Sequence, residues 1–143
     1  MAGIAVLNIE QGKLQVAADT LKQAETIMQQ VFEKPHPFHA ILYYNKSRLL
    51  LLQGKTKEAI AEANKAIAIT ERFFEPEHPS HGDNYTLLGD ILVSARKGEQ
   101  AKAYYRKADK IYQHTYKKNH RNRTYLRDIL NRLDPKQEML AVF

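Results

Sequence analysis

The sequence predicts an all-α fold of stacked repeats, a helical solenoid. The first observation is a step of 42 residues, which leads from His36-Pro37 to His78-Pro79 and then to His120. The second is that apolar residues keep the same step: Ala17, Ala59 and Ala101; Ala24, Ala66 and Ala108; Ile27, Ile69 and Ile111. The third is that apolar residues within each step recur at helical spacing, whereas no segment alternates as a strand does. A constant period of about 20–50 residues is typical of solenoids.

The period divides one domain into repeats of about 1–37, 38–79 and 80–121, followed by a partial repeat over 122–143. Each full repeat is expected to hold two helices joined by a turn. The predicted helices cover residues 2–11, 13–32, 38–53, 55–74, 80–96, 98–118, 122–132 and 135–142. Met1 falls inside the first helix of its repeat, which predicts that the chain is part of a longer array.

The turn and stop signals agree with these bounds in the second repeat and differ in the third. Gly54 ends a helix because glycine adopts positive φ without strain, and Pro76 stops the next helix. Arg96 occupies the position where the period calls for glycine, and the nearest glycine is Gly98. We therefore expect a shifted turn, either with a longer helix before it or with a bulge. Asp134-Pro135-Lys136-Gln137 is a helix-start signature and predicts a short C-terminal capping helix.

Composition excludes several classes of protein. The 143 residues fit one domain, and the longest strongly apolar run, Leu49–Leu52, is far too short to cross a membrane. The N-terminus lacks the features of a signal peptide, and the chain has no cysteine. These features favour a reducing compartment, and we expect a cytoplasmic location without a membrane partner.

The net charge of +6 is unevenly distributed along the chain. Residues 1–95 hold 9 basic and 11 acidic side chains, whereas residues 96–143 hold 13 basic and 5 acidic ones. The basic segment 114–123 lies among Tyr112, Tyr116 and Tyr125. This pattern is found on surfaces that bind single-stranded nucleic acid or acidic partners, but also on ordinary solvated helix ends. We consider nucleic acid the less favoured partner.

No motif indicates a metal site or a catalytic site. His36 and His39, like His78 and His81, lie close together, but no cysteine and no third ligand accompany them. The sequence also has no glycine-rich phosphate loop and no serine in a nucleophile elbow. We therefore expect a protein that is not an enzyme and that needs no cofactor.

The repeats resemble those of the tetratricopeptide-repeat family, in the 42-residue variety of kinesin light chains. From His36 the sequence reads HPFHAILYYNKSRLLLLQGKTKEAIAEANKAIAI, and from His78 it reads HPSHGDNYTLLGDILVSARKGEQAKAYYRKADKI. Asn45, Gly54, Ala59 and Ala66 fall where this pattern puts them. The resemblance implies a right-handed superhelix whose first helices line a concave groove, and a module that binds a peptide or a partner protein there.

The register of this resemblance assigns residues to the groove. The predicted peptide-binding residues are Ile41, Tyr44, Asn45, Arg48, Asp83, Thr86, Asp90, Tyr125, Asp128 and Arg132. The register also turns Leu52 toward the groove, and Val93 is a further candidate. Tyrosine and arginine are the types that concentrate binding energy. Asn45 would contact a peptide backbone or, alternatively, pack between repeats, and Arg48 or Arg132 would meet a carboxylate. The lysine and asparagine pattern that clamps a C-terminal carboxylate in some family members is absent.

Two rival functions remain at this stage. The first is binding of nucleic acid or an acidic partner through residues 114–123. The second is oligomerisation through residues 2–9, whose helix is apolar nearly all round.

Overall fold

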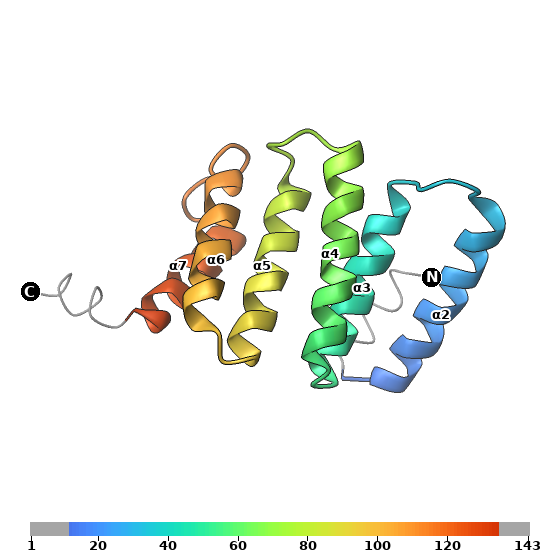
Figure 1. The fold of residues 1–143 in the computed structure, drawn as a ribbon. Helices are drawn as coiled ribbons and strands as arrows, with labels where there is room; N and C mark the ends of the chain where they lie inside the picture. Colours follow the sequence, from blue (N-terminus) through green and yellow to red (C-terminus); the bar gives the residue numbers. More distant parts are fainter. Residues whose placement is uncertain (1–11, 135–143) are drawn as a thin grey trace, which may run out of the picture. The chain divides into compact units, whose positions relative to one another are not determined.

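A computed structural model describes residues 12–134, and within them it contains helices and no strands (Figure 1). The helices are α2 (Leu14–Val31), α3 (Phe38–Leu52), α4 (Thr56–Phe73), α5 (Pro79–Ser94), α6 (Gly98–Tyr112) and α7 (Arg121–Leu133). The chain divides into two compact units between Glu75 and Pro76. The prediction of an all-α repeat fold is confirmed. The helices predicted at 2–11 and 135–142 lie outside the described residues.

In the first unit, small residues allow the helices to approach closely. Ala17, Leu21 and Ala24 of α2 form a buried cluster with Leu42 and Leu49 of α3. The facing positions of α4 are Ala59, Ala63 and Ala66, each at most 1% exposed. Ser47 of α3 is also fully buried, and its hydroxyl donates a hydrogen bond of 2.7 Å to the carbonyl of Ala59. The small serine therefore keeps α3 and α4 in contact and satisfies its own polar group.

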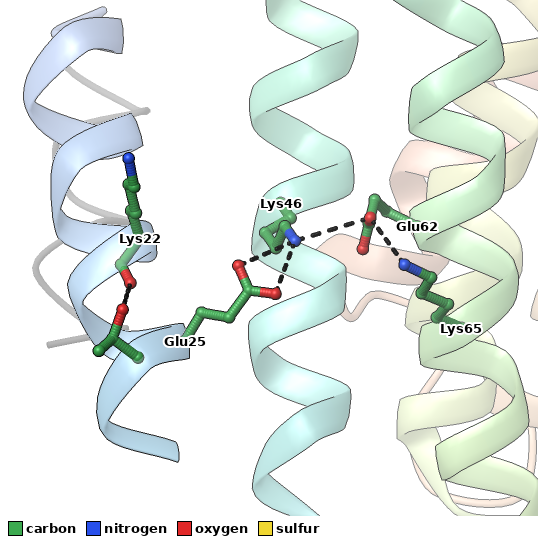
Figure 2. A network of polar contacts seen from close by, with 6 residues as sticks. Lys22, Glu25, Lys46, Glu62 and Lys65 are labelled. Carbon is green, nitrogen blue, oxygen red and sulfur yellow. Dashed lines mark hydrogen bonds and ion pairs between the residues drawn. The ribbon is translucent and has the colours of Figure 1, made fainter. Parts of the chain in front are cut away.

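A chain of charged side chains links α2, α3 and α4 (Figure 2). Lys46 of α3 lies between two carboxylates, with its Nζ 3.2 Å from Glu25 of α2 and 3.6 Å from Glu62 of α4. Glu62 also pairs with Lys65 at 3.2 Å. The Lys46 and Glu25 side chains are 24% and 33% exposed, so solvent screens their ion pair and it adds little to stability.

In the second unit, glycines on α5 face tyrosines on α6. A Cβ atom at Gly82 would lie 2.4 Å from the ring of Tyr112, and one at Gly89 would lie 2.5 Å from the ring of Tyr105. Both tyrosines are at most 1% exposed. Because each ring occupies the space that a side chain on α5 would need, the two glycines are required for this packing.

The turn at Arg96 corrects the prediction of a shifted turn. Arg96 itself adopts the left-handed conformation at φ 61°, as Gly54 does at φ 77° one step earlier. In both turns the amide of the following residue donates to the carbonyl five residues before it, at 2.9 Å after Gly54 and 2.8 Å after Arg96. The two turns therefore have the same geometry, and Gly98 simply begins α6.

Helix α6 is shorter than predicted. It ends at Tyr112, whereas the sequence suggested a helix over 98–118. The carbonyl of Tyr116 accepts a hydrogen bond of 3.2 Å from Arg123, and the Tyr116 ring stacks on His120 with 3.8 Å between centroids. These contacts hold the segment 113–120 in a non-helical path toward α7.

The periodic histidines lie at the N-termini of α3, α5 and α7. The Nδ1 atoms of His36, His78 and His120 each accept a hydrogen bond of 3.1 Å from the amide two residues ahead. A free amide at a helix N-terminus needs such an acceptor, so the histidines serve as caps. The cap at His120 forms although Arg121 follows it where the other repeats have proline.

Candidate functional site

The predicted groove residues of the first unit lie on one face of α3. Ile41, Tyr44, Arg48 and Leu52 follow one another at spacings of three and four, which places them along one side of a helix. Ile41 is 50% and Leu52 53% exposed, which is high for large apolar side chains. The guanidinium carbon of Arg48 lies 6.0 Å from the centre of the Tyr44 ring. We call these four residues the α3 face.

Asn45 does not belong to this exposed surface, which corrects its assignment as a contact for a peptide backbone. The residue is 1% exposed, and its amide nitrogen donates a hydrogen bond of 3.0 Å to the carbonyl of Ile41. Asn45 therefore takes the packing role that the sequence left open. Its Oδ1 is buried without a hydrogen-bond partner among the described residues.

In the second unit, the structure brings together two groove residues that were predicted on different helices. The Asp90 carboxylate of α5 accepts a hydrogen bond of 2.6 Å from the Tyr125 hydroxyl of α7. The same oxygen accepts a second bond of 2.6 Å from Tyr105 of α6. Burial, together with the adjacent Asp90 carboxylate, raises the pKa of both tyrosines above the usual value of 10. One carboxylate thus joins α5, α6 and α7.

Asp83 is held in the same way two helical turns earlier on α5. Its carboxylate accepts a short hydrogen bond from the hydroxyl of Tyr112. Burial raises the pKa of Asp83 above its ordinary value, against the opposing effects of the Tyr112 hydrogen bond and of the nearby Arg121 guanidinium. The sequence analysis missed the roles of Tyr105 and Tyr112. Tyr105 and Tyr112 are seven residues apart, as are Gly82 and Gly89. This equal spacing could have indicated that the tyrosines of one helix pack against the glycines of the other.

The remaining predicted groove residues of this unit differ in exposure. Thr86 is half-buried, and its hydroxyl donates a hydrogen bond of 2.8 Å to the carbonyl of Gly82 within α5. Asp128 and Arg132 are exposed on α7. Val93 is half-buried. The α7 side chains are therefore the accessible charges, whereas Asp83 and Asp90 already accept tyrosine hydroxyls.

The aromatic residues of the basic segment are engaged within the protein. Tyr112 is 1% exposed and bonded to Asp83, Tyr116 stacks on His120, and Tyr125 is bonded to Asp90. Base stacking requires an open aromatic face. Tyr112 is therefore unavailable for stacking and the Tyr116 ring already stacks on His120, whereas Tyr125 stays 39% exposed.

Within residues 12–134, no group of three or more histidine, cysteine, aspartate or glutamate side chains is placed to hold a metal ion. The histidines that prompted the question include His36 and His78, which cap helices. Among the same residues, no helix is long and apolar enough to cross a membrane.

Two helical hairpins related by one 42-residue step, with the same left-handed turn in each, define a helix-turn-helix repeat protein. The chain belongs to the tetratricopeptide-repeat family: one tetratricopeptide-repeat model matches residues 1–72, and a second matches residues 82–115. No curated protein matches the chain.

A solved structure supports the same fold. It is a crystal structure from Podosopora anserina, described as a kinesin light chain with nearly identical TPR-like repeats. The match has 20% sequence identity and a TM-score of 0.78, and it covers 92% of this chain and 62% of that one. The chain thus spans less than two thirds of that relative. Tetratricopeptide repeats generally mediate protein–protein interaction and typically serve as non-enzymatic scaffolds.

Proposed function

We propose that this chain binds a peptide segment of a partner protein on the exposed faces of its first helices and acts without catalysis. The observation that carries the proposal is the α3 face, where Ile41 and Leu52 are about half exposed on either side of Tyr44 and Arg48. Apolar side chains in such a row gain free energy when a partner covers them, at roughly 25 cal/mol per Å² of apolar surface.

The chemistry of the α3 face suggests the segment it would bind. Ile41 and Leu52 favour apolar side chains, and the Arg48 guanidinium favours a carboxylate that it can bind with two hydrogen bonds. Tyr44 supplies a rigid aromatic surface of the type that dominates binding energy. We therefore propose a segment in which apolar residues flank an acidic one.

The second unit supports a more polar contact. Asp90 fixes the Tyr125 hydroxyl, so the ring is held in place before any partner arrives. The exposed Asp128 and Arg132 lie one turn apart on the same helix and offer charges of both signs. A preorganised surface binds with less loss of side-chain freedom.

The test begins with a partner identified by affinity capture and mass spectrometry, followed by measurement of its affinity with purified protein. The double variant Tyr44→Ala with Arg48→Ala is expected to weaken binding by about tenfold or more, since each residue type contributes over ~1 kcal/mol at interfaces. Phe73→Ser, an exposed aromatic on α4, is the control and leaves binding unchanged. Unaltered affinity in the double variant, with the helical content intact, contradicts the proposal.

The two rival functions receive less support. Of the three tyrosines near 114–123, Tyr112 is buried and Tyr116 stacks on His120, which leaves Tyr125 as the exposed ring for nucleic-acid binding. A steep dependence of affinity on salt would identify such binding. Self-association through residues 2–9 concerns residues outside those described, and sedimentation over a range of concentrations tests it. A cytoplasmic site of action accords with a chain that has no cysteine.

A further inference from the structure

A basic pocket lies between α6 and α7, on the side of α7 away from Tyr125. It has a volume of about 250 Å³ and is lined by Asp109, Lys118, Arg123, Arg127, Leu130 and Asn131. Three of these side chains are cations and one is a carboxylate, so the lining carries a net charge of +2. We call this cavity the α6–α7 pocket.

Protein acceptors hold both guanidinium groups of the pocket in place. Arg123 donates through Nε to Asp109 at 3.4 Å and through Nη1 to the carbonyl of Tyr116 at 3.2 Å. Arg127 donates through Nη2 to the carbonyl of Lys118 at 2.8 Å. A guanidinium has five N–H donors, so each retains donors beyond these bonds. The contacts therefore orient the two groups without using up their capacity to bind an anion.

The location of the pocket separates it from the groove residues. Successive residues of a helix are rotated by about 100°, so Arg123, Arg127 and Leu130 lie roughly opposite Tyr125, Asp128 and Arg132. The contacts agree, because Arg123 pairs with Asp109 of α6 whereas Tyr125 bonds Asp90 of α5. A ligand in the α6–α7 pocket would leave the opposite face of α7 open.

The charge and size of the pocket indicate the ligand. Oriented guanidinium groups bind the oxygen atoms of phosphate through paired hydrogen bonds, and a phosphomonoester carries about −1.5 to −2 at pH 7, which matches the net charge of the lining. The cavity, at about 250 Å³, has room for one such group, whereas a nucleic-acid strand requires a groove of cations with open aromatic rings. We propose that the α6–α7 pocket binds the phosphoryl group of a phosphorylated serine or threonine on a partner protein.

The experiment uses the full chain and a fluorescein-labelled peptide of glycine and alanine with one central phosphoserine. Fluorescence anisotropy at physiological salt is expected to show binding at least ~10-fold tighter than that of the same peptide with serine, because hydrogen bonds to charged groups contribute about 1.5–3 kcal/mol. Arg127→Gln should weaken the phosphopeptide by about tenfold or more for the same reason. Arg106→Gln removes an equal charge from the exposed face of α6 and should change the affinity less than about twofold.

Further variants distinguish the possible outcomes. Arg127→Lys keeps the charge but loses the planar fork, so it should also weaken binding. Lys118→Gln gives an independent test if a change at Arg127 disturbs the helix, and circular dichroism checks the fold of each variant. Equal affinity for the serine peptide, or affinity that survives both substitutions, overturns the proposal. Tighter binding of a single-stranded oligonucleotide than of the phosphopeptide also overturns it, in favour of nucleic acid.

The groove proposal can fail separately. The Tyr44→Ala and Arg48→Ala double variant should bind the phosphopeptide as the unaltered protein does, because those residues belong to the α3 face. Loss of phosphopeptide binding in that variant contradicts the assignment of the phosphoryl group to the α6–α7 pocket.

Discussion

The α3–α4 and α5–α6 hairpins share one register but fill the space between their helices differently. The step of 42 residues relates Ser47 to Gly89, Ala63 to Tyr105, Ala40 to Gly82 and Thr70 to Tyr112. In the first hairpin both helices carry small residues at these positions. In the α5–α6 hairpin, α5 has glycine at these positions and α6 has tyrosine. The same backbone arrangement therefore accepts two distributions of side-chain volume.

This difference changes the exposed face as well as the interior. Asp83 and Asp90 accept hydrogen bonds from the hydroxyl groups of Tyr112 and Tyr105, which reach them from α6. The equivalent positions of the first hairpin are Ile41 and Arg48. The first hairpin thus offers an apolar and basic face for binding, whereas the second uses its acidic residues to hold its own helices together.

The largest effect is expected when a buried tyrosine ring of the second hairpin is removed. Tyr105→Ala leaves an unfilled space against Gly89 and deprives Asp90 of one hydroxyl, although Ala63 occupies the equivalent position in the first hairpin. Loss of a buried aromatic ring costs about 3–5 kcal/mol of unfolding free energy. Urea unfolding followed by circular dichroism measures the change.

Tyr105→Phe provides the matched control for that substitution. It keeps the ring but removes the hydroxyl that bonds Asp90, and should cost only about 1–2 kcal/mol. If Tyr105→Ala were no worse than Tyr105→Phe, the ring would not be needed to fill the second hairpin, and the contrast between the hairpins would fail.

The next effect comes from adding volume on the other helix. Gly89→Ala places a Cβ about 2.5 Å from the Tyr105 ring, which must move. Overpacking of this kind costs about 1–3 kcal/mol, although alanine gains up to about 1 kcal/mol of helix propensity. The control is Gly98→Ala in α6, where the nearest atom, on Leu133, is 3.8 Å away. Thermal unfolding should show a lower midpoint for Gly89→Ala and no decrease for Gly98→Ala.

The double variant Gly89→Ser with Tyr105→Ala recreates the Ser47 and Ala63 pair of the first hairpin. Because serine occupies part of the space that the ring leaves, the double variant should lose less unfolding free energy than the sum of the losses in the two single variants. Additive costs would show that the two positions do not interact.

Much of the fold could be predicted from the sequence because the same pattern of apolar residues recurs in three repeats. The recurrence of Ala17, Ala59 and Ala101 fixes the register, and helical spacing supplies most helix bounds. The end of α6 could not be predicted in this way, since it depends on Arg123 and Tyr116, which meet only in the folded chain. Local patterns do not contain such contacts.

The site could be predicted less fully than the fold. Register assigned Asp90 and Tyr125 to the same groove, but it did not predict the hydrogen bond that joins these residues, which are 35 positions apart. It did not reveal that Asn45 is buried, because its side chain bonds back to its own helix. Nor did it reveal the α6–α7 pocket, which depends on the non-helical path of residues 113–120.

The turns of the two hairpins provide a fourth, smaller test. Arg96 holds a left-handed conformation that costs a residue with a Cβ about 1–2 kcal/mol, whereas Gly54 holds it without this cost. Arg96→Gly should therefore stabilise the protein by about 1 kcal/mol, and Gly54→Ala should destabilise it by a similar amount. Urea midpoints that move in the same direction for both variants would contradict the equivalence of the two turns.

The smallest expected effect concerns the dependence of stability on pH. Ile41 has no titratable group. Asp83, which occupies the equivalent position 42 residues later, has a pKa raised by burial. The folded carboxyl group then holds its proton more tightly than the unfolded one. Its contribution to stability is fully present below pH 3.8 and is lost as the pH rises through the raised pKa.

Asp83→Asn should remove this dependence, because the amide oxygen still accepts the Tyr112 hydroxyl but does not ionise. The unfolding free energy of the variant, relative to the unaltered protein, should increase from pH 4 to pH 7 by less than about 1 kcal/mol, since solvent screens a partly exposed group. Asp128→Asn, an exposed residue on α7, serves as the control in urea titrations at each pH. A constant difference would mean that folding leaves the pKa of Asp83 unchanged, and a difference that falls with pH would mean that the fold favours its charged form. In the second case the Tyr112 hydrogen bond and the nearby Arg121 would outweigh its burial.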